Sequence, residues 1–266
     1  MKPVADALLA ALDGATLTGL PSAEQPGFSL ADGYAVADSN RSRRIARGER
    51  PRGYKIGFTN RGIWARYGVY APIWGPVWDS TLTLLDGTAA TLSLAGLVQP
   101  RIEPEIVFGI RRRPDASMNA AELAACIEWV AHGVEVVHTH YAGWRFEAAD
   151  TVADFALHGR LLVGPRVPVH TFEALASDLA GLKVELRRDG ERVDVGDASI
   201  VLDGPLNAFK IWLGAMQEHS PQWVVEPGDV VTTGTITDAW PLLPGQRWQT
   251  RLSDPRLAGL ALSTQP

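Results

Sequence analysis

A change of hydrophobic periodicity near residue 53 constrains the fold of this chain more than any other feature. Before it, apolar residues recur at helical spacing over 4–12, and residues 29–48 predict a second helix. After it, short apolar runs separated by Asp-Gly and Pro-Gly pairs predict strands and turns. We therefore expect an α/β (mixed α+β) protein with an N-terminal helical region over 1–52 and a β-rich domain over 53–266.

Several elements can be placed within the β-rich domain. Asp-Gly pairs predict two hairpins, over 82–94 and over 182–195. Helices are expected over 119–131 and 205–218, and the second begins at a proline that suits a first helical turn. Two further strands follow Pro-Gly pairs, at 230–233 and 247–252. No repeat or long linker separates these elements, so the body is interpreted as one domain.

Composition and charge exclude several classes of protein. The net charge of −5 argues against nucleic acid as a partner, because phosphate binding usually requires a basic domain. No stretch reaches the roughly 18 apolar residues that a membrane span needs. Asp6 and Asp13 interrupt the apolar start, unlike the core of a secretory signal. With Cys126 as its single cysteine, the chain is expected to be cytoplasmic, with no membrane partner.

The run RIEPEIVFGI carries two acidic residues on one face of a predicted strand. Alternation places Glu103 and Glu105 on the same side, about 6.6 Å apart along the strand. Pro104 cannot donate to a ladder, which favours an edge or a locally distorted strand. Two neighbouring carboxylates repel unless a cation lies between them. The pattern therefore permits a Mg²⁺ or Mn²⁺ site, or two solvent-facing glutamates.

A third acidic residue lies inside the valine-rich run GVEVVH. Glu135 in such a run indicates either an ion pair with an arginine or a metal ligand that joins Glu103 and Glu105. His138 and His140 have a spacing used by metal sites, but along a strand they face away from Glu135. These two histidines are therefore expected to be structural.

Lys55 lies in the run GYKIGFTN, between apolar Tyr54 and Ile56. A lysine in this position either extends to solvent or meets an acid or a substrate carboxylate. Burial would depress its pKa toward values useful for a base. Motifs of serine hydrolases, P-loops, dinucleotide-binding folds and zinc proteases are absent.

Six segments occur in the order and spacing of a known family. They are GYKIGFTN (53–60), QPRIEPEIVF (99–108), IEWVAHGVEVV (127–137), DTVADFALHGRLLVG (150–164), GPLNAFKIWL (204–213) and GDVVTTG (228–234). The chain resembles the 2-keto-4-pentenoate hydratases and the related 2-oxo-3-enedioate decarboxylases of the fumarylacetoacetate hydrolase superfamily.

This resemblance implies a rolled β-sheet body of the fumarylacetoacetate hydrolase type, preceded by helices, and a homo-oligomer. It implies that Glu103, Glu105 and Glu135 bind Mg²⁺ or Mn²⁺ and that Lys55 is catalytic. The implied reaction is hydration of a small 2-hydroxy-2,4-dienoic acid to a 4-hydroxy-2-oxo acid. The protein would then be a lyase of aromatic-compound catabolism.

A mechanism of this kind needs further residues. Thr59, Asp154 and Thr235 are expected to contact the substrate, and Asp79 or a metal-polarised water is expected to assist a second proton transfer. The chain also departs from the family pattern. It reads Asp-Phe-Ala-Leu from Asp154 where relatives often have Asp-Asn-Ala-Ser, and Pro-Val-Trp from Pro76 where they often have Asp-x-Met. These departures bear on the substrate and on the acid/base assignment.

Other activities stay open at this stage. A 2-oxo-3-enedioate decarboxylase would use the same site with a cation near the far end of the substrate, for which Arg61 or Arg66 is available. A non-catalytic homologue that partners an active enzyme would keep the fold without turnover. Hydrolysis of an acylpyruvate is less favoured, because the N-terminal helical segment is more typical of the hydratase branch.

Overall fold

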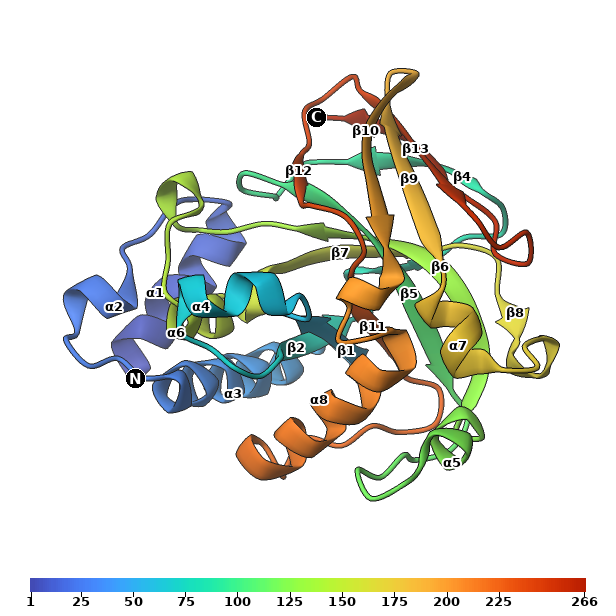
Figure 1. The fold of residues 1–266 in the computed structure, drawn as a ribbon. Helices are drawn as coiled ribbons and strands as arrows, with labels where there is room; N and C mark the ends of the chain where they lie inside the picture. Colours follow the sequence, from blue (N-terminus) through green and yellow to red (C-terminus); the bar gives the residue numbers. More distant parts are fainter.

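The protein contains two β-sheets. Its structure is a computed structural model that describes residues 1–266. The larger sheet contains β1 (Pro51–Gly57), β2 (Ile73–Trp78), β3 (Leu82–Leu84), β5 (Arg101–Ile110), β6 (Ile127–Val137), β7 (His158–Val163), β8 (Val167–Pro168), β11 (Val230–Thr235) and β12 (Trp240–Pro241). Its main path runs β2-β1-β11-β5-β6-β7-β3, while β12 pairs with β5 and β8 with β6. The sheet is curled, as the resemblance predicts (Figure 1).

The smaller sheet has five strands in the order β10-β9-β13-β14-β4. Their bounds are β4 (Ala89–Ser93), β9 (Lys183–Arg188), β10 (Glu191–Asp197), β13 (Arg247–Leu252) and β14 (Ala261–Gln265). In Figure 1 this sheet lies at the upper right, away from the N-terminal helices. The alternating burial of β13 and β14 shows that only one face of each strand packs against the body.

Helices surround the larger sheet. They are α1 (Lys2–Gly14), α2 (Pro21–Glu24), α3 (Leu30–Ala46), α4 (Trp64–Tyr67), α5 (Ala120–Ala124), α6 (Ala148–Ala153), α7 (Leu175–Ala180) and α8 (Pro205–His219). The first three gather at one side of the molecule, in blue in Figure 1, and α3 packs against α1 and α6. The mixed α/β class expected from the sequence is therefore confirmed, and none of these helices is long and apolar enough to span a bilayer.

Both helices expected near the N-terminus are present. Ser29 caps α3, because its hydroxyl accepts from the backbone N–H of Asp32 while the Asp32 carboxylate accepts from the Ser29 N–H. Tyr34 on α3 stacks on Trp74 of β2, with ring centroids 4.4 Å apart. This contact ties the helical region to the edge of the larger sheet.

The helix expected over 119–131 is much shorter than predicted. Asn119 caps α5, which ends at Ala124, and β6 begins at Ile127. The apolar residues from 123 to 131 fit a helical period as well as a buried strand, and pairing with β5 decides between them. This correction matters for the site, because β6 carries Glu135.

One of the two expected hairpins is also wrong. Strand β3 pairs in parallel with β7, whereas β4 pairs in parallel with β14 of the smaller sheet. The Asp-Gly pair at 86–87 therefore connects two sheets, because the apolar residues of β4 pack into the core beside the smaller sheet. The second hairpin is confirmed, with Asp189 and Gly190 both at positive φ between β9 and β10.

Helix α8 covers the larger sheet with large apolar side chains. Phe209 contacts Phe108 of β5 at a centroid distance of 5.7 Å, and Trp212 contacts Tyr54 of β1 at 5.3 Å. All four side chains are buried in the largest apolar core. The strands β1 and β5 are thereby held from one face, which leaves the acidic residues of β5 on the other.

Candidate metal centre and active site

Three glutamates converge where β5 and β6 pair. The antiparallel register sets Glu103 directly opposite Glu135. Glu105 lies two residues along β5, on the same face as Glu103, because side chains alternate along a strand. One carboxylate oxygen from each residue lies within 4.8 Å of the other two. The pairing of β5 with β6 therefore brings three carboxylates together, two from β5 and one from β6.

The carboxylates of this cluster are poorly satisfied by the protein. Oε2 of Glu105 accepts from the N–H of Gly234 at 2.8 Å, and Oε1 has no partner. Oε1 of Glu135 contacts His158 Nδ1 at 2.7 Å, and Oε2 has no hydrogen bond. Both residues are fully buried, where an unpaired carboxylate oxygen is costly. Orphaned, buried oxygens directed at one point are what a hard divalent cation requires, so these residues fit Mg²⁺ or Mn²⁺.

Charge leads to the same conclusion. Three ionised carboxylates beside the single ammonium of Lys55 leave two negative charges uncompensated. Burial, partly offset by Lys55, raises the pKa of Glu103 to about 7, and burial together with the other two carboxylates raises the pKa of Glu105 well above its usual value. Without a cation this cluster therefore retains protons, and a divalent cation would compete with them.

Glu135 responds differently. Burial alone would raise its pKa, but the Lys55 ammonium and the hydrogen bond from His158 outweigh burial and lower the pKa of Glu135. It is therefore the carboxylate of the cluster that stays ionised most readily. One acid of the three is charged before any cation arrives.

Lys55 lies on β1 with its side chain almost fully buried. Nζ donates to the carbonyl of Ala156 at 3.0 Å and lies 3.4 Å from Oε2 of Glu135. Burial would lower its pKa, but Glu135, Glu103 and Glu105 outweigh burial and raise the pKa of Lys55. Without a cation in the cluster, the three carboxylates therefore outweigh the depression that burial alone would cause, and the pKa of Lys55 favours the ammonium.

The carbonyl that receives Lys55 belongs to an unusual turn. Phe155, Ala156 and Leu157 all have positive φ, at 54°, 52° and 64°. Non-glycine residues rarely adopt this left-handed region, and consecutive ones are held only where the surroundings enforce them. Gly75 of β2 enables the approach, because a Cβ there would come within 2.9 Å of the Phe155 carbonyl. Backbone strain in this turn thus positions the acceptor for Lys55.

A cavity of about 240 Å³ opens beside the cluster. Lys55 and Glu103 line it, as do Thr59 and Thr235, which the sequence predicts at the substrate. Its other lining residues include four aromatic and two basic side chains, Phe58, Tyr67, Trp144, Phe146, Arg66 and Arg101, together with aliphatic residues and Asp238. The space is suited to a small acid whose polar end meets the cluster.

Two of the predicted site residues lie elsewhere. Asp79 is exposed after β2, and its Oδ1 accepts from the backbone N–H of Arg50 at 3.0 Å. Asp154 is buried at the end of α6, where its carboxylate accepts from the N–H of His140 at 2.9 Å and from Thr139 Oγ1 at 3.0 Å. Neither lines the cavity. His140 Nδ1 also contacts Asp154, so this histidine faces away from the glutamates.

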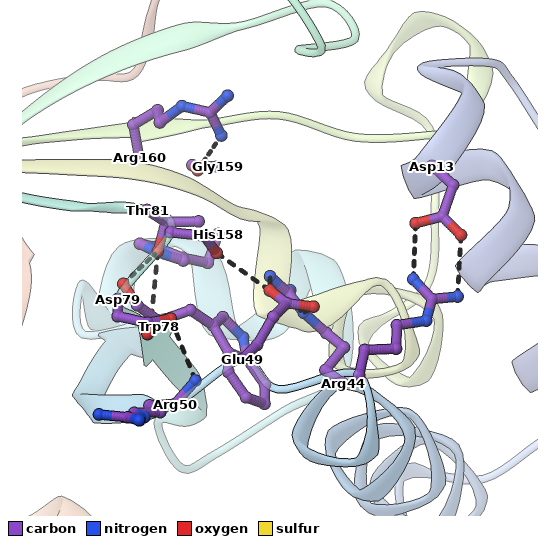
Figure 2. Close-up of polar contacts among 12 residues, drawn as sticks. Asp13, Arg44, Glu49, Arg50, Trp78, Asp79, Thr81, His158, Gly159 and Arg160 are labelled. Carbon is purple, nitrogen blue, oxygen red and sulfur yellow. Dashed lines mark hydrogen bonds and ion pairs between the residues drawn. The ribbon is translucent and has the colours of Figure 1, made fainter.

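Several residues of the site escaped sequence reasoning. His158 contacts Glu135 on one side and Thr81 on the other, and Figure 2 shows the side that faces Thr81. Arg101 lines the cavity with no carboxylate partner, whereas Arg61 is paired with Asp203 outside it. The two glutamates of the run around Glu103 indicate a site from the local sequence alone. His158 lies 23 positions after Glu135, and no local pattern around it indicates a role in the site.

Comparisons with known proteins find relatives of this chain, although no family model matches it. The 2-keto-4-pentenoate hydratase of Paraburkholderia phymatum is 32% identical over 76% of this chain and 74% of its own length. The 2-hydroxyhexa-2,4-dienoate hydratase of Comamonas testosteroni is 30% identical over 84% of this chain and 82% of its own. A 4-oxalocrotonate decarboxylase of a Pseudomonas species is 29% identical over 88% of each.

Solved structures also resemble this chain. The 4-oxalocrotonate decarboxylase of Pseudomonas putida G7, complexed with magnesium and adipate, has a TM-score of 0.89 and 26% identity over 98% of this chain and 96% of its own. A fumarylpyruvate hydrolase from Pseudomonas aeruginosa, in complex with Mn²⁺ and pyruvate, shares the fold with a TM-score of 0.62 and 16% identity over 80% of this chain and 89% of its own.

Fold and acidic cluster together define an enzyme of the fumarylacetoacetate hydrolase-like fold. Within that class, the chain belongs to the family of 2-keto-4-pentenoate hydratases and 4-oxalocrotonate decarboxylases, which are lyases. The family expected from the six sequence segments is therefore confirmed.

Proposed function

We propose that the protein is a cytoplasmic Mg²⁺- or Mn²⁺-dependent hydratase that adds water to a 2-hydroxy-2,4-dienoate and releases a 4-hydroxy-2-oxo acid. One observation carries this proposal: three carboxylates, two of them fully buried, converge beside one buried ammonium at a cavity. The hydratases that are 30% and 32% identical to the chain support the choice of reaction.

Glu103, Glu105 and Glu135 are the residues proposed to hold the cation, and Glu105 and Glu135 each offer a buried oxygen that lacks a protein partner. A divalent cation held there would act as a Lewis acid and stabilise negative charge that develops on the substrate. Lys55 lies beside this cluster and lines the cavity, so we propose that it holds negative charge on the substrate and transfers a proton to carbon.

The remaining predicted residues divide by position. Thr59 and Thr235 line the cavity, and we propose that their side chains contact the substrate. Asp79 and Asp154 lie outside the cavity, so we assign neither a contact with the reacting atoms. Because Asp79 is excluded, the second proton transfer is assigned to water within the cavity.

A decarboxylase is the second candidate, favoured by a specific observation. Arg66 and Arg101 line the cavity, and neither has a carboxylate partner in the chain. Two free guanidiniums beyond the acidic cluster suit a substrate with a second carboxylate at its far end. Such an enedioate would lose carbon dioxide at the site that hydrates a dienoate.

Product analysis separates these reactions. The protein would be given 2-hydroxypenta-2,4-dienoate or 2-oxohex-3-enedioate with Mg²⁺, and again with EDTA. Hydration would give a product heavier by one water, and decarboxylation would release dissolved carbon dioxide. Mn²⁺ binding without turnover of either acid would contradict both reactions and would indicate a non-catalytic homologue.

We further propose that the protein forms a homo-oligomer, as its family resemblance implies. Light scattering coupled to size-exclusion chromatography measures the mass directly. A particle with the 28.7 kDa mass of one chain at micromolar concentration would contradict this proposal.

A further inference from the structure

His158 lies at the start of β7, where it pairs with Val137 of β6, and its side chain is 1% exposed. Its Nδ1 is 2.7 Å from Oε1 of Glu135, and its Nε2 is 2.8 Å from Oγ1 of Thr81. The imidazole therefore bridges a proposed metal ligand and a buried hydroxyl. It does not line the cavity, so it has no path to the substrate.

The direction of these hydrogen bonds follows from what each group can donate. An ionised carboxylate only accepts, so Nδ1 of His158 carries the proton that Glu135 receives. Nε2 is then an acceptor, and the Thr81 hydroxyl donates to it at 2.8 Å, a shorter contact than its alternative acceptor, the Trp78 carbonyl at 3.2 Å. The Thr81 oxygen in turn accepts from the backbone N–H of Trp78 at 3.1 Å. The chain of donors thus runs from Trp78 through Thr81 and His158 to Glu135.

The outer end of this chain is also held. Asp79, next to Trp78, accepts from the Arg50 N–H with its carboxylate, and its own N–H donates to the Arg50 carbonyl at 2.9 Å (Figure 2). The turn that presents Thr81 is therefore fixed to the strand segment before β1. Asp79 has a structural place in the site although it does not reach the cavity.

This arrangement determines which oxygen of Glu135 remains available. Oε1 is engaged by His158, and Oε2 has no hydrogen bond and faces the other two carboxylates. Lys55 lies 3.4 Å from Oε2, too far to fix the carboxylate rotamer by a good hydrogen bond. His158 is thus the contact that orients the side chain.

We propose that His158 is a positioning residue which, with Thr81, fixes Glu135 so that Oε2 is presented to the divalent cation. The proposal rests on the metal centre of the proposed function, and it extends that centre to two residues that touch neither cation nor substrate. Outer contacts of this kind set the orientation of a ligand and the affinity of the site.

Mn²⁺ affinity, measured from the paramagnetic resonance of free Mn²⁺, tests the proposal without any substrate. We expect His158→Leu to weaken Mn²⁺ binding by about 10- to 100-fold. His158→Asn should recover most of that loss, because its amide nitrogen can take the place of Nδ1–H. Thr81→Val should weaken binding less than His158→Leu, and Thr81→Ser should bind as the wild type does.

His170→Leu is the matched control, since this histidine is exposed and far from the donor chain. Two results would overturn the proposal: wild-type affinity in folded His158→Leu, or no recovery in His158→Asn. If His158→Leu does not fold, the Thr81 variants decide, and equal affinity of Thr81→Val and the wild type would overturn it.

Failure of the proposed function gives a different pattern. A wild-type protein that binds Mn²⁺ but converts neither acid overturns the lyase activity, and the ranking of the variants by affinity still supports the role of His158. A wild-type protein that binds no Mn²⁺ overturns both.

Discussion

Unpartnered oxygens, rather than the number of acids, distinguish this cluster from a surface patch of glutamates. Glu105 and Glu135 each engage one oxygen with the protein and leave the other without a partner in a buried position. Glu103 joins them from the cavity side. The identity of each of the three side chains should therefore matter individually.

Glu103→Gln tests this dependence. The amide keeps the shape but removes a charge, so we expect Mg²⁺-dependent turnover to be lost while the far-ultraviolet circular dichroism stays that of the wild type. Glu128→Gln is the matched control, because Glu128 lies on β6 but is exposed, and it should keep full activity. Full activity in Glu103→Gln would refute the metal centre.

A buried histidine away from the cluster predicts a loss of stability in acid. Burial and the nearby His140, partly offset by Asp154, lower the pKa of His138 to about 3. The unfolded chain titrates near 6.5, so between about pH 6.5 and 3 it binds one more proton at this residue than the folded chain does. Stability is therefore lost as the pH falls through this window.

Urea unfolding at pH 6.5, 5.5 and 4.5 measures this effect. His138→Asn retains an acceptor for the Val98 N–H, and we expect it to reduce the dependence of unfolding free energy on pH by about 1.4 kcal/mol per pH unit. His170→Asn, at an exposed position, should keep the wild-type slope. If the unfolding free energy of His138→Asn depended on pH as that of the wild type does, burial of the His138 imidazole would not be a cause of lost stability in acid.

Among the elements, β11 contacts both the cavity and the acidic cluster, at a point where its pairing with β5 is irregular. Its register with β5 shifts between Thr232 and Thr235, and Gly234 within the shift has a φ of 106°. This bend aims the Gly234 N–H at Glu105. A Cβ at the same position would lie 1.9 Å from Oγ1 of Thr59.

Gly234→Ala should therefore destabilise the protein by about 1–3 kcal/mol and weaken Mn²⁺ binding, because the strained φ and the clash displace both neighbours. Gly214→Ala is the matched control. Gly214 lies in α8 with open space around its Cβ position, so we expect a gain of about 0.5–1 kcal/mol there. Equal unfolding free energies for the two variants would contradict this interpretation.

Local patterns were sufficient for some elements and misleading for others. The capping residues Ser29 and Asn119 mark two helix starts correctly, because caps act within one turn. The apolar run after 123 suits a helix or a buried strand, and the partner strand that decides is not encoded locally. The valine-rich run around Glu135 left an ion pair and a metal ligand equally open, and the resemblance favoured the ligand, since alternation alone relates only Glu103 and Glu105.

The molecule as a whole brings distant segments to the site. Lys55 belongs to β1, its acceptor Ala156 to the turn before β7, and the glutamates to β5 and β6. His132 of β6 links the two sheets, because its ring contacts the Glu105 carbonyl at 3.0 Å and Thr250 of β13 at 2.8 Å. Binding at the cluster is thereby coupled to the folding of the entire chain.

Mg²⁺ should accordingly stabilise the protein. At about 100 times its Kd, a ligand adds about 2.7 kcal/mol, which corresponds to a rise in Tm of about 5–10 °C for a chain of this size. The rise should be larger at pH 8 than at pH 5.5, because Glu103, with a pKa of about 7, and Glu105 must release protons.

Thermal melts with Mg²⁺ and with EDTA at both pH values measure this difference. Glu103→Gln should show a much smaller rise than the wild type. Equal Tm values with Mg²⁺ and EDTA at pH 8 would contradict a metal centre in the folded protein.

The pairing of Glu103 with Glu135 has a consequence for how the chain tolerates changes in length. The connection over 111–126 can gain or lose residues, because neither ligand moves when only the link between the two strands changes. Deletion of Pro104 from β5, or of one residue of β6 before Glu135, would instead turn a carboxylate to the opposite face of the sheet. Substitutions can accumulate around this centre, whereas single-residue insertions and deletions in its two strands would dismantle it.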